Sequence, residues 1–363
     1  MAHGPTHPKL RYAPDYAIPP GETLRDTLEA LEMTQADLAR RTGLSTKHIN
    51  QIILGGAPIT PETALALERV TGVAAGFWAR LDANYQAREA VKRERLTLDP
   101  NLSWLPLLPI NDLVRRGYIR PSSDPITRLQ DVLSFFGVAS ARAWRDVWMA
   151  PDAAFKKSAA FSSNPYAVAC WLRMGELEAV ELDCPPFDRE RFGRTLTEIR
   201  SLMRSERSLA ESELKRLCCE SGVATVIVEE TKDSRISGAA RWLTPTKALI
   251  QLSWRYRWAD HFWFSFFHEA GHLVLHGKRD AFVDQADQGD PGKEAQANQF
   301  AARMLIPLEY EYRLPQLKTI GAIQAFADSI GIPAGIVVGR LQRDRVIGFN
   351  FGNQLRERYP KLD

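Results

Sequence analysis

Residues 260–277 read DHFWFSFFHEAGHLVLHG, an apolar run built around His268-Glu269-Ala270-Gly271-His272. The run is apolar nearly all round, which predicts a buried helix with Asp260 as its N-cap and His276-Gly277 as its C-terminal stop. Histidines four apart share one face of a helix and can reach the same metal ion. Since an unpaired buried charge costs several kcal/mol, these polar groups need partners, and one metal supplies them.

The spacing favours zinc, held by His268 and His272 with an open coordination position beside Glu269. A carboxylate there takes a proton from a metal-bound water, whose pKa zinc lowers to about 7, and delivers it to the leaving amine. The motif therefore predicts hydrolysis of an amide bond.

Glu294 is the candidate for the third protein ligand. It opens a second helical pattern that ends at Pro307 and has an apolar stripe of Ala297, Phe300, Ala301 and Met304. A helix antiparallel to the first would place the Glu294 carboxylate over the imidazole pair. Aspartates in the intervening loop are the alternatives: Asp280, Asp284, Asp287 and Asp290. His276 lies at a helix end, two turns from His268, so we interpret it as a residue that caps the helix or supports a ligand.

The segment from Ile250 to Pro307 resembles the ImmA/IrrE family of zinc-dependent metallo-endopeptidases. The resemblance lies in Ile250–Ser253, Asp260–Phe264, Leu275-His276, Glu294–Ala301 and Met304–Pro307. It implies that His268, His272 and Glu294 bind zinc and that Glu269 is the catalytic base. It also implies a specific target, because characterised members cleave a repressor and thereby switch on mobile-element transfer or a stress response.

The composition is that of a globular protein with room for about two or three domains in 363 residues. A net charge of +3 argues against wholesale coating of nucleic acid but leaves room for a local contact face. No stretch resembles a signal peptide or a membrane span. The cysteines lack a paired metal-ligand spacing and are interpreted as reduced thiols of a soluble, cytoplasmic protein: Cys170, Cys184, Cys218 and Cys219.

Residues 20–88 predict an all-helical bundle. Leu24, Leu28 and Leu31 form the apolar side of a first helix that ends near Met33. Thr34 caps the second helix, Gly43 makes the turn and Ser45 caps the third. Thr60-Pro61-Glu62 starts the fourth, whose core side comprises Ala64, Leu65, Leu67 and Val70. Two short helices joined through a glycine turn indicate a helix-turn-helix.

The second helix of that motif enters the major groove with its N-terminal residues. The candidates for DNA contact are Ser45, Thr46, Lys47 and His48, with Asn50 and Gln51 one turn on. The bundle resembles the lambda-repressor-like family, and within it the HigA antitoxin branch, through Met33–Ala39 and Pro58–Ala64. That resemblance implies contacts from Gln35, Thr46, Lys47 and Asn50. An alternative is a bundle kept for dimerisation or partner binding, since acids balance the bases: Asp26, Glu29, Glu32 and Asp37.

The middle of the chain shows no catalytic constellation. Residues 89–125 read as a connector with a Pro-rich stretch, and a basic run nearby (Arg88, Lys92, Arg93, Arg95) is interpreted as a solvated helix face. Residues 126–220 predict a helical scaffold, with helices over Ile126–Phe136, Ala139–Met149, Pro165–Val180, Phe187–Met203 and Leu209–Cys219.

Three short strands precede the zinc motif: Val223–Val228, Ser237–Trp242 and Ala248–Leu252. In zincin-type enzymes such a sheet lies over the active-site helix, and its edge strand can bind an extended peptide. After the motif, Thr319–Asp328 predicts a helix, and Ile332–Gln342 resembles the end of long, HigA-fused ImmA/IrrE proteins.

The expected fold is mainly α with a small β-sheet: an all-α helix-turn-helix bundle followed by an α+β zincin-like metallopeptidase domain. The expected divisions are a flexible N-terminus (1–19), the bundle (20–88), the connector (89–125), the scaffold (126–220), the metallopeptidase core (221–315) and a C-terminal helical region (316–363).

The favoured function is a DNA-binding regulatory zinc metallo-endopeptidase, a homodimer on double-stranded operator DNA that cleaves a repressor or another regulatory protein. The alternative is a HigA-like transcription regulator or antitoxin whose peptidase-like domain senses a signal or binds a toxin without turnover. A structural zinc site fits less well, because the ligand set leaves an open position. Candidates for stabilising the oxyanion are Arg255, Tyr256 and His276, and an Asp-rich loop between Phe282 and Lys293 could hold the site latent.

Overall fold

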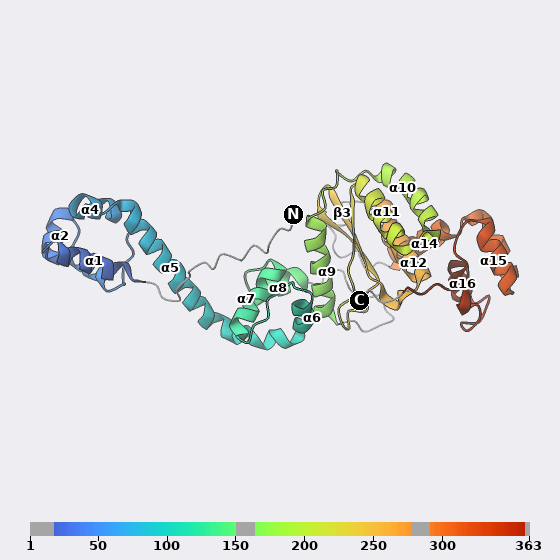
Figure 1. Ribbon diagram of the computed structural model, residues 1–363, viewed down its shortest axis with the longest axis horizontal. Coiled ribbons are helices and arrows are strands. Elements are labelled where there is room, and N and C mark those ends of the chain that lie inside the picture. Colours follow the sequence, from blue (N-terminus) through green and yellow to red (C-terminus); the bar gives the residue numbers. More distant parts are fainter. Residues whose placement is uncertain (1–17, 150–163, 277–290, 360–363) are drawn as a thin grey trace, which may run out of the picture. The chain divides into compact units, whose positions relative to one another are not determined.

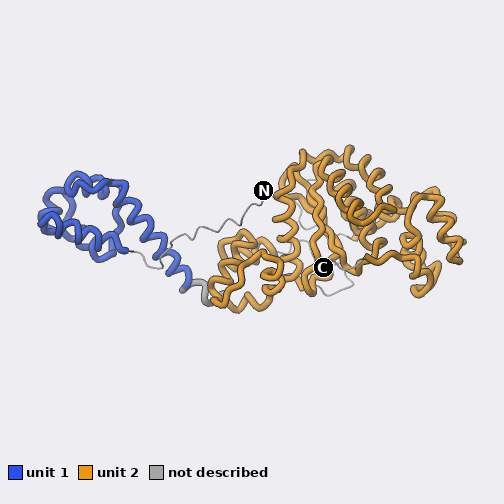
Figure 2. The backbone as a smooth tube through the Cα atoms, in the orientation of Figure 1, with its two compact units in different colours: residues 1–100 blue, residues 101–363 orange. Residues whose placement is uncertain are grey.

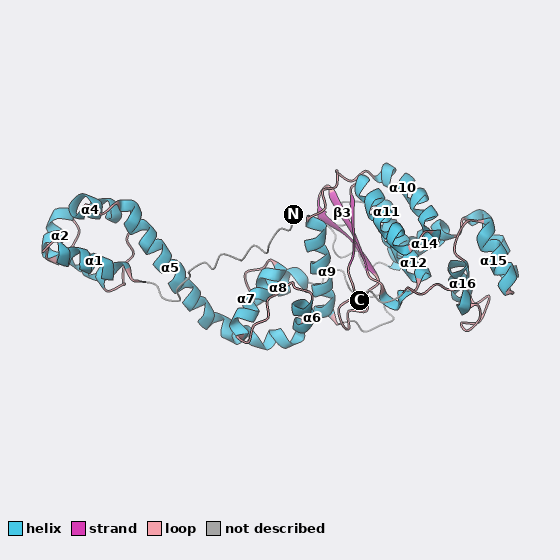
Figure 3. Cartoon of the chain, viewed as in Figure 1, coloured by secondary structure: helices cyan, strands magenta, loops and turns pink. Residues whose placement is uncertain are grey.

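The computed structural model describes residues 18–149, 164–276 and 291–359. The chain divides into two compact units, residues 1–100 and 101–363 (Figure 2). It is mainly helical, with a single three-stranded sheet in the described part of the second unit (Figure 3). The expected fold class is confirmed.

The first unit is a helical bundle with a long final helix. Its elements are α1 (Pro20–Ala30), α2 (Gln35–Thr42), α3 (Thr46–Ile53), α4 (Pro61–Thr71) and α5 (Ala75–Leu98). The core contains Leu24, Leu38, Ile49, Leu67 and Trp78, all fully buried. Helix α5 continues to Leu98, past the point at which the sequence led us to expect the connector.

The predicted caps of this bundle are confirmed. The Thr34 hydroxyl accepts a hydrogen bond from the Asp37 amide at 3.1 Å, and Ser45 accepts one from the His48 amide at 3.1 Å. Gly43 ends α2 with φ 75°, a left-handed conformation that glycine adopts without steric cost. These caps separate two eight-residue helices, as a helix-turn-helix requires.

Two leucines assigned to this core are exposed instead. Leu31 is 44% exposed because α1 ends at Ala30, which leaves Leu31 beyond the last turn. Leu65 is 48% exposed, because the buried face of α4 follows Ala64 and Leu67 and one residue step turns a helix by about 100°.

The second unit begins with a helical region. Its elements are η1 (Asp99–Leu107), α6 (Ile110–Arg115), α7 (Pro125–Phe136), α8 (Ala141–Trp148), α9 (Pro165–Val180), α10 (Arg189–Ser201), η2 (Leu202–Arg204) and α11 (Arg207–Glu220). These helices match the predicted ones closely, and α9 has the predicted bounds. Asp124, Ser140 and Asn164 cap α7, α8 and α9 with their side chains, which explains the sharp helix starts.

The sheet and the helices that carry the motif follow. They are β1 (Val223–Ile227), β2 (Gly238–Thr244), β3 (Lys247–Leu252), η3 (Arg255–Arg257), α12 (Ala259–Leu275), α14 (Pro291–Leu305), η5 (Leu308–Gln316), α15 (Ile320–Ser329), α16 (Ala334–Arg343) and η6 (Asn353–Leu355) (Figure 1).

The strand order is β1-β3-β2, with β3 in the centre. Strand β1 pairs parallel to β3, so that Val223 lies opposite Ala248, whereas β2 pairs antiparallel, with Ala240 opposite Ile250. Helix α12 packs against β2, β3 and α14. Trp263, Phe266 and Phe267 fill the core beneath it. The sheet therefore covers the motif helix, and β2 lies at the sheet edge.

Asp260 is not the N-cap of α12. The helix begins at Ala259 after Trp258, and Asp260 lies inside the first turn. Its buried carboxylate instead accepts a hydrogen bond from Arg356 at 2.8 Å. The acid thus fixes the C-terminal segment against α12 rather than starting the helix.

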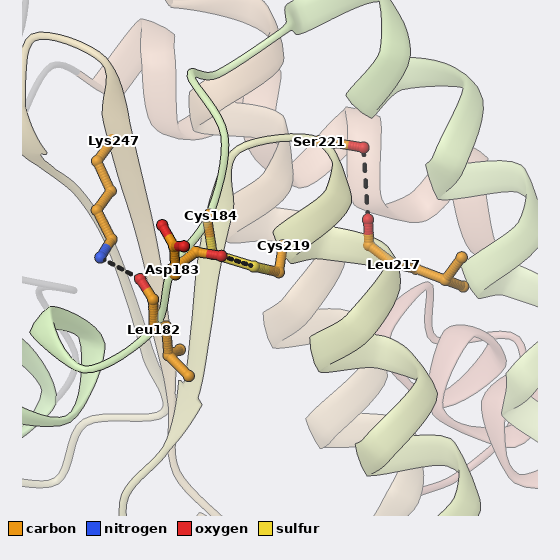
Figure 4. Close-up of a disulfide and its surroundings, with 7 residues drawn as sticks. All are labelled: Leu182, Asp183, Cys184, Leu217, Cys219, Ser221 and Lys247. Carbon is orange, nitrogen blue, oxygen red and sulfur yellow. Dashed lines mark hydrogen bonds between the residues drawn. A yellow bond between two sulfur atoms is a disulfide. The ribbon is translucent and has the colours of Figure 1, made fainter.

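Cys184 and Cys219 form a disulfide, so the interpretation of all four cysteines as reduced thiols is wrong for this pair (Figure 4). Cys184 lies after α9 and Cys219 near the end of α11, and folding brings their Cα atoms to 5.0 Å across 35 residues. Nearby, the Lys247 ammonium donates a hydrogen bond to the Leu182 carbonyl (Figure 4). Cys170 and Cys218 are free and buried.

None of the helices in the three described ranges is by itself long and apolar enough to cross a membrane. Helices α15 and α16 meet that criterion only as a pair, bent by 116°.

Candidate metal centre

Two helices bring the predicted metal ligands together. His268 and His272 lie one turn apart on α12, and Glu294 lies in the first turn of α14. One ligand atom of each residue lies within 4.8 Å of the others, and all three side chains are half-buried. No other group of three such side chains in the described ranges could hold a metal ion.

The separations between these atoms suit a tetrahedral metal ion. The two Nε2 atoms lie 3.1 Å apart. Each Nε2 lies 3.4 Å from an oxygen of Glu294, Oε2 for His268 and Oε1 for His272. Ligands at the usual zinc distances occupy corners of a tetrahedron with edges of about 3.4 Å. The residues present therefore fit zinc without rearrangement of the backbone.

Glu269 lies beside these ligands in a buried position between α12 and β2. The backbone amide of Ala240 donates a hydrogen bond to its carboxylate. Burial raises the pKa of Glu269, although both neighbouring histidines and the Ala240 bond act in the opposite direction. A carboxyl group whose pKa is raised is better able to accept and hold a proton, as a general base must.

Glu294 and His268 form the charged part of the group. Hydrogen bonds from His268 and His272 hold the pKa of Glu294 far below its usual range, so the carboxylate is ionised. Burial opposes a charge on His268, but the bond to Glu294 and the charges of Glu269 and Glu294 outweigh it and raise the pKa of His268. Glu294 is thus an anionic oxygen donor, ready to bind a cation.

The outward-facing nitrogens of the two histidines also have partners. His268 Nδ1 lies 3.1 Å from Asn298 Oδ1. His272 Nδ1 lies 3.1 Å from His276 Nδ1, and His276 Nε2 lies 3.2 Å from Gln296 Oε1. His276 is also the C-cap of α12, as its position at the helix end predicted, and it contacts the candidate ligand His272.

Comparison with known families gives two matches in this chain. Residues 24–78 match the family described as helix-turn-helix, and residues 230–341 match the IrrE N-terminal-like domain. The chain joins a helix-turn-helix domain to an IrrE N-terminal-like domain. No curated protein matches the sequence. The resemblances to a helix-turn-helix family and to the ImmA/IrrE family are confirmed, and the HigA branch stays a prediction.

The match to the IrrE N-terminal-like domain encloses every residue of the candidate metal centre. It begins before β2 and ends inside α16, so it also includes the edge strand that contacts Glu269. The candidate metal centre therefore lies in the domain that carries the expected family match. The competing ligands Asp280, Asp284, Asp287 and Asp290, and most of the Asp-rich loop, lie outside the described residues.

Tyr256 and Arg255 form a pair on η3. The Arg255 guanidinium lies 4.5 Å from the centre of the Tyr256 ring, which is 43% exposed and also faces His261. His276 contacts the outward nitrogen of His272 rather than the face that carries Glu294. None of these contacts assigns an oxyanion-stabilising role.

In the helix-turn-helix domain, the residues predicted to contact DNA cluster at the start of α3. Thr46, Lys47 and Asn50 are exposed, and Gln35 is half-buried at the start of α2. The Ser45 oxygen already accepts the His48 amide, so Ser45 reaches a phosphate only through its hydroxyl hydrogen. Among the nearby acids, Asp37 bonds to Thr34 and Arg40, which reduces its repulsion of DNA.

Four residues of the site escaped prediction from sequence. Asn298 and Gln296 belong to the Glu294–Ala301 box, but the box alone assigned a role only to Glu294. Gly238 and Ala240 lie about 30 residues before the motif, and nothing in the sequence indicates that they touch Glu269. Helical spacing from Glu294 could have suggested Asn298, four residues on.

Proposed function

We propose that the protein is a zinc metallo-endopeptidase that acts on a regulatory protein and binds operator DNA. The observation that carries the proposal is the convergence of His268, His272 and Glu294 at tetrahedral separations beside a buried Glu269. The family match supports a metallopeptidase-type domain, and the specific substrate and the zinc identity are our inference.

His268, His272 and Glu294 would hold the zinc, which supplies Lewis acidity for activating a water at neutral pH. Glu269 would accept the proton of that water at its carboxylate and donate it to the leaving amine nitrogen. The Ala240 amide would keep the carboxylate oriented during both transfers. Strand β2, at the sheet edge beside Glu269, would bind an extended segment of the substrate through main-chain hydrogen bonds.

The helix-turn-helix domain would bind double-stranded DNA as a homodimer on two half-sites. Thr46 and Asn50 would contact bases, and Gln35, Ser45 and Lys47 would contact phosphates. Because operator DNA is the proposed partner, we expect the protein to act in the cytoplasm. A repressor is the favoured class of substrate, and stress-response or toxin–antitoxin roles would follow from its identity.

The test uses a substrate trap. Glu269→Gln should keep zinc, capture the substrate and leave it intact, whereas wild-type protein should cleave the captured partner. A control variant, His268→Ala/His272→Ala, should lose both zinc and cleavage. Cleavage by Glu269→Gln at the wild-type rate would rule out the proposed mechanism, and a partner that is bound but never cut would favour a regulator without turnover.

A further inference from the structure

We propose that Asn298, Gln296 and His276 are positioning residues that fix the tautomer and ring orientation of the two zinc-binding histidines. The inference rests on the proposed zinc site and extends it to residues that do not bind the metal. It follows from the direction of each hydrogen bond around the two imidazoles.

A neutral imidazole carries one proton, so the nitrogen that binds a metal leaves the proton on the other. His268 directs Nε2 toward Glu294 and Nδ1 toward the Asn298 amide oxygen, at 3.1 Å. An amide oxygen only accepts, so when His268 Nε2 gives up the proton that it shares with Glu294 in order to bind zinc, the proton that remains sits on Nδ1. The Nε2 lone pair of His268 is then free for zinc.

His272 also carries its proton on Nδ1, and in its case the hydrogen bonds run through a second histidine, His276. The Nδ1 of His272 faces His276 Nδ1 at 3.1 Å, and His276 Nε2 faces the Gln296 oxygen at 3.2 Å. The Gln296 oxygen requires the proton of His276 on Nε2, which makes His276 Nδ1 an acceptor. It therefore accepts from His272 Nδ1, and the Nε2 lone pair of His272 is free for zinc.

Both chains of hydrogen bonds end on helix α14, which also supplies Glu294. Residues 294, 296 and 298 thus provide one ligand and two anchors within five consecutive residues. Close packing of α12 against α14 lets side chains of α14 contact the histidines of α12. A β-carbon at Gly271 would lie 3.3 Å from the Ala297 Cα and 3.1 Å from the Phe300 ring. Docking of α14 on α12 therefore completes the ligand set and orients it in one step.

The hydrogen-bond path to His268 contains one residue and the path to His272 contains two, so the proposal can be tested by whether the effects of substitutions on zinc affinity add. Asn298 acts on His268 alone, whereas Gln296 and His276 act in series on His272. Losses of partners that orient metal ligands typically weaken metal binding by about 10- to 100-fold. Substitutions of two residues in the same hydrogen-bond path should have non-additive effects on zinc affinity. Substitutions in the two different paths should have additive effects.

The experiment measures the zinc dissociation constant of the full-length protein by competition with a chelating dye, together with the visible spectrum of the cobalt form. We expect Asn298→Ala and Gln296→Leu each to weaken zinc binding by about 10- to 100-fold and to alter the cobalt bands. The zinc dissociation constant of the double variant Gln296→Leu/His276→Phe should equal that of His276→Phe alone. In the double variant Gln296→Leu/Asn298→Ala, the two losses of zinc affinity should multiply. Asn298→Asp and Gln296→Glu keep an acceptor oxygen and should restore binding.

Gln299→Ala, at an exposed position of the same helix, is the matched control and should bind zinc as the wild type does. Circular dichroism of each metal-free variant separates misfolding from lost orientation, and rescue by the acidic variants makes the same distinction. Wild-type zinc affinity in Asn298→Ala and Gln296→Leu would overturn this inference alone. Absence of zinc binding in the wild type would instead overturn the proposed function.

Discussion

The Glu269 carboxylate lies directly against Gly238: a β-carbon at residue 238 would be 2.9 Å from Oε1 and from Cγ of Glu269. Real side chains essentially never approach so closely. The proposed base on α12 is therefore confined by the backbone of β2, which also donates the Ala240 amide to it. Strand β2, at the edge of the sheet, therefore fixes the position of the proposed general base.

Gly238→Ala should displace the Glu269 carboxylate while leaving the three zinc ligands in place. A displacement of about 1 Å costs on the order of 100-fold in rate. We expect cleavage of the trapped substrate to fall by about that factor with the zinc content unchanged. Gly193→Ala is the matched control, because a β-carbon there meets open space. Equal activities of the two variants would show that Gly238 does not confine the base.

Glu269→Gln should raise the midpoint of thermal unfolding of the metal-free protein. Burial raises the pKa of Glu269 above the usual value of a glutamate, so the ionised carboxylate destabilises the folded state. This cost is absent at a pH below the unfolded pKa, where the group is protonated in both states, and develops as the pH rises through the folded pKa. The advantage of the variant should thus be largest near neutral pH and vanish in acid. Thermal unfolding measured across pH tests this, and a constant or reversed difference contradicts it.

Thiol labelling should separate the four cysteines into two pairs. Burial raises the pKa of Cys218 to about 12 and also raises that of Cys170, so neither forms a reactive thiolate in the folded protein. The oxidised native protein should take up no alkylating reagent, and mild reduction should expose only Cys184 and Cys219. Denaturant should be needed for the other two. Mass spectrometry of labelled peptides gives the answer, and labelling of Cys184 before reduction would contradict the disulfide.

Lys47→Ala and Asn50→Ala should weaken DNA binding in different ways. Lys47 is proposed to contact phosphate, so its loss should lower affinity for every sequence and reduce the salt slope by about 1. Asn50 is proposed to contact a base, so its loss should relax specificity at one position by about 1–3 kcal/mol. Binding is measured on sequences selected by the wild type. Arg69→Ala, in the last turn of α4, is the control and should change neither property. Wild-type behaviour of both α3 variants would favour a bundle kept for partner binding.

Local sequence signals predicted much of this fold. Thr34, Ser45 and Gly43 mark helix ends because caps and left-handed turns depend on one residue and its near neighbours. The His-x-x-x-His spacing predicted a shared face for the same reason. The predictions were wrong where a contact with a segment distant in the sequence determines the role of a residue. Arg356, 96 residues from Asp260, takes the carboxylate that had been assigned to a cap.

The residues of the candidate site also fall into those that a local sequence pattern predicts and those that only tertiary packing brings together. His268 and His272 follow from helical periodicity, and Glu294 from the need for a third ligand. Gly238 comes from a strand whose approach to α12 depends on the packing of the whole sheet. The disulfide depends on a similar approach, of the segment after α9 to α11. Contacts of this kind depend on tertiary structure, and no local pattern encodes them.

The most direct test of the central claim compares protein termini in cells that carry the wild type with those in cells that carry Glu269→Gln. We predict that one regulatory protein gains a new terminus only with the wild type, while the variant leaves that protein intact and still contains zinc. Identical termini in both strains under every stress applied would contradict the account of this chain as a peptidase.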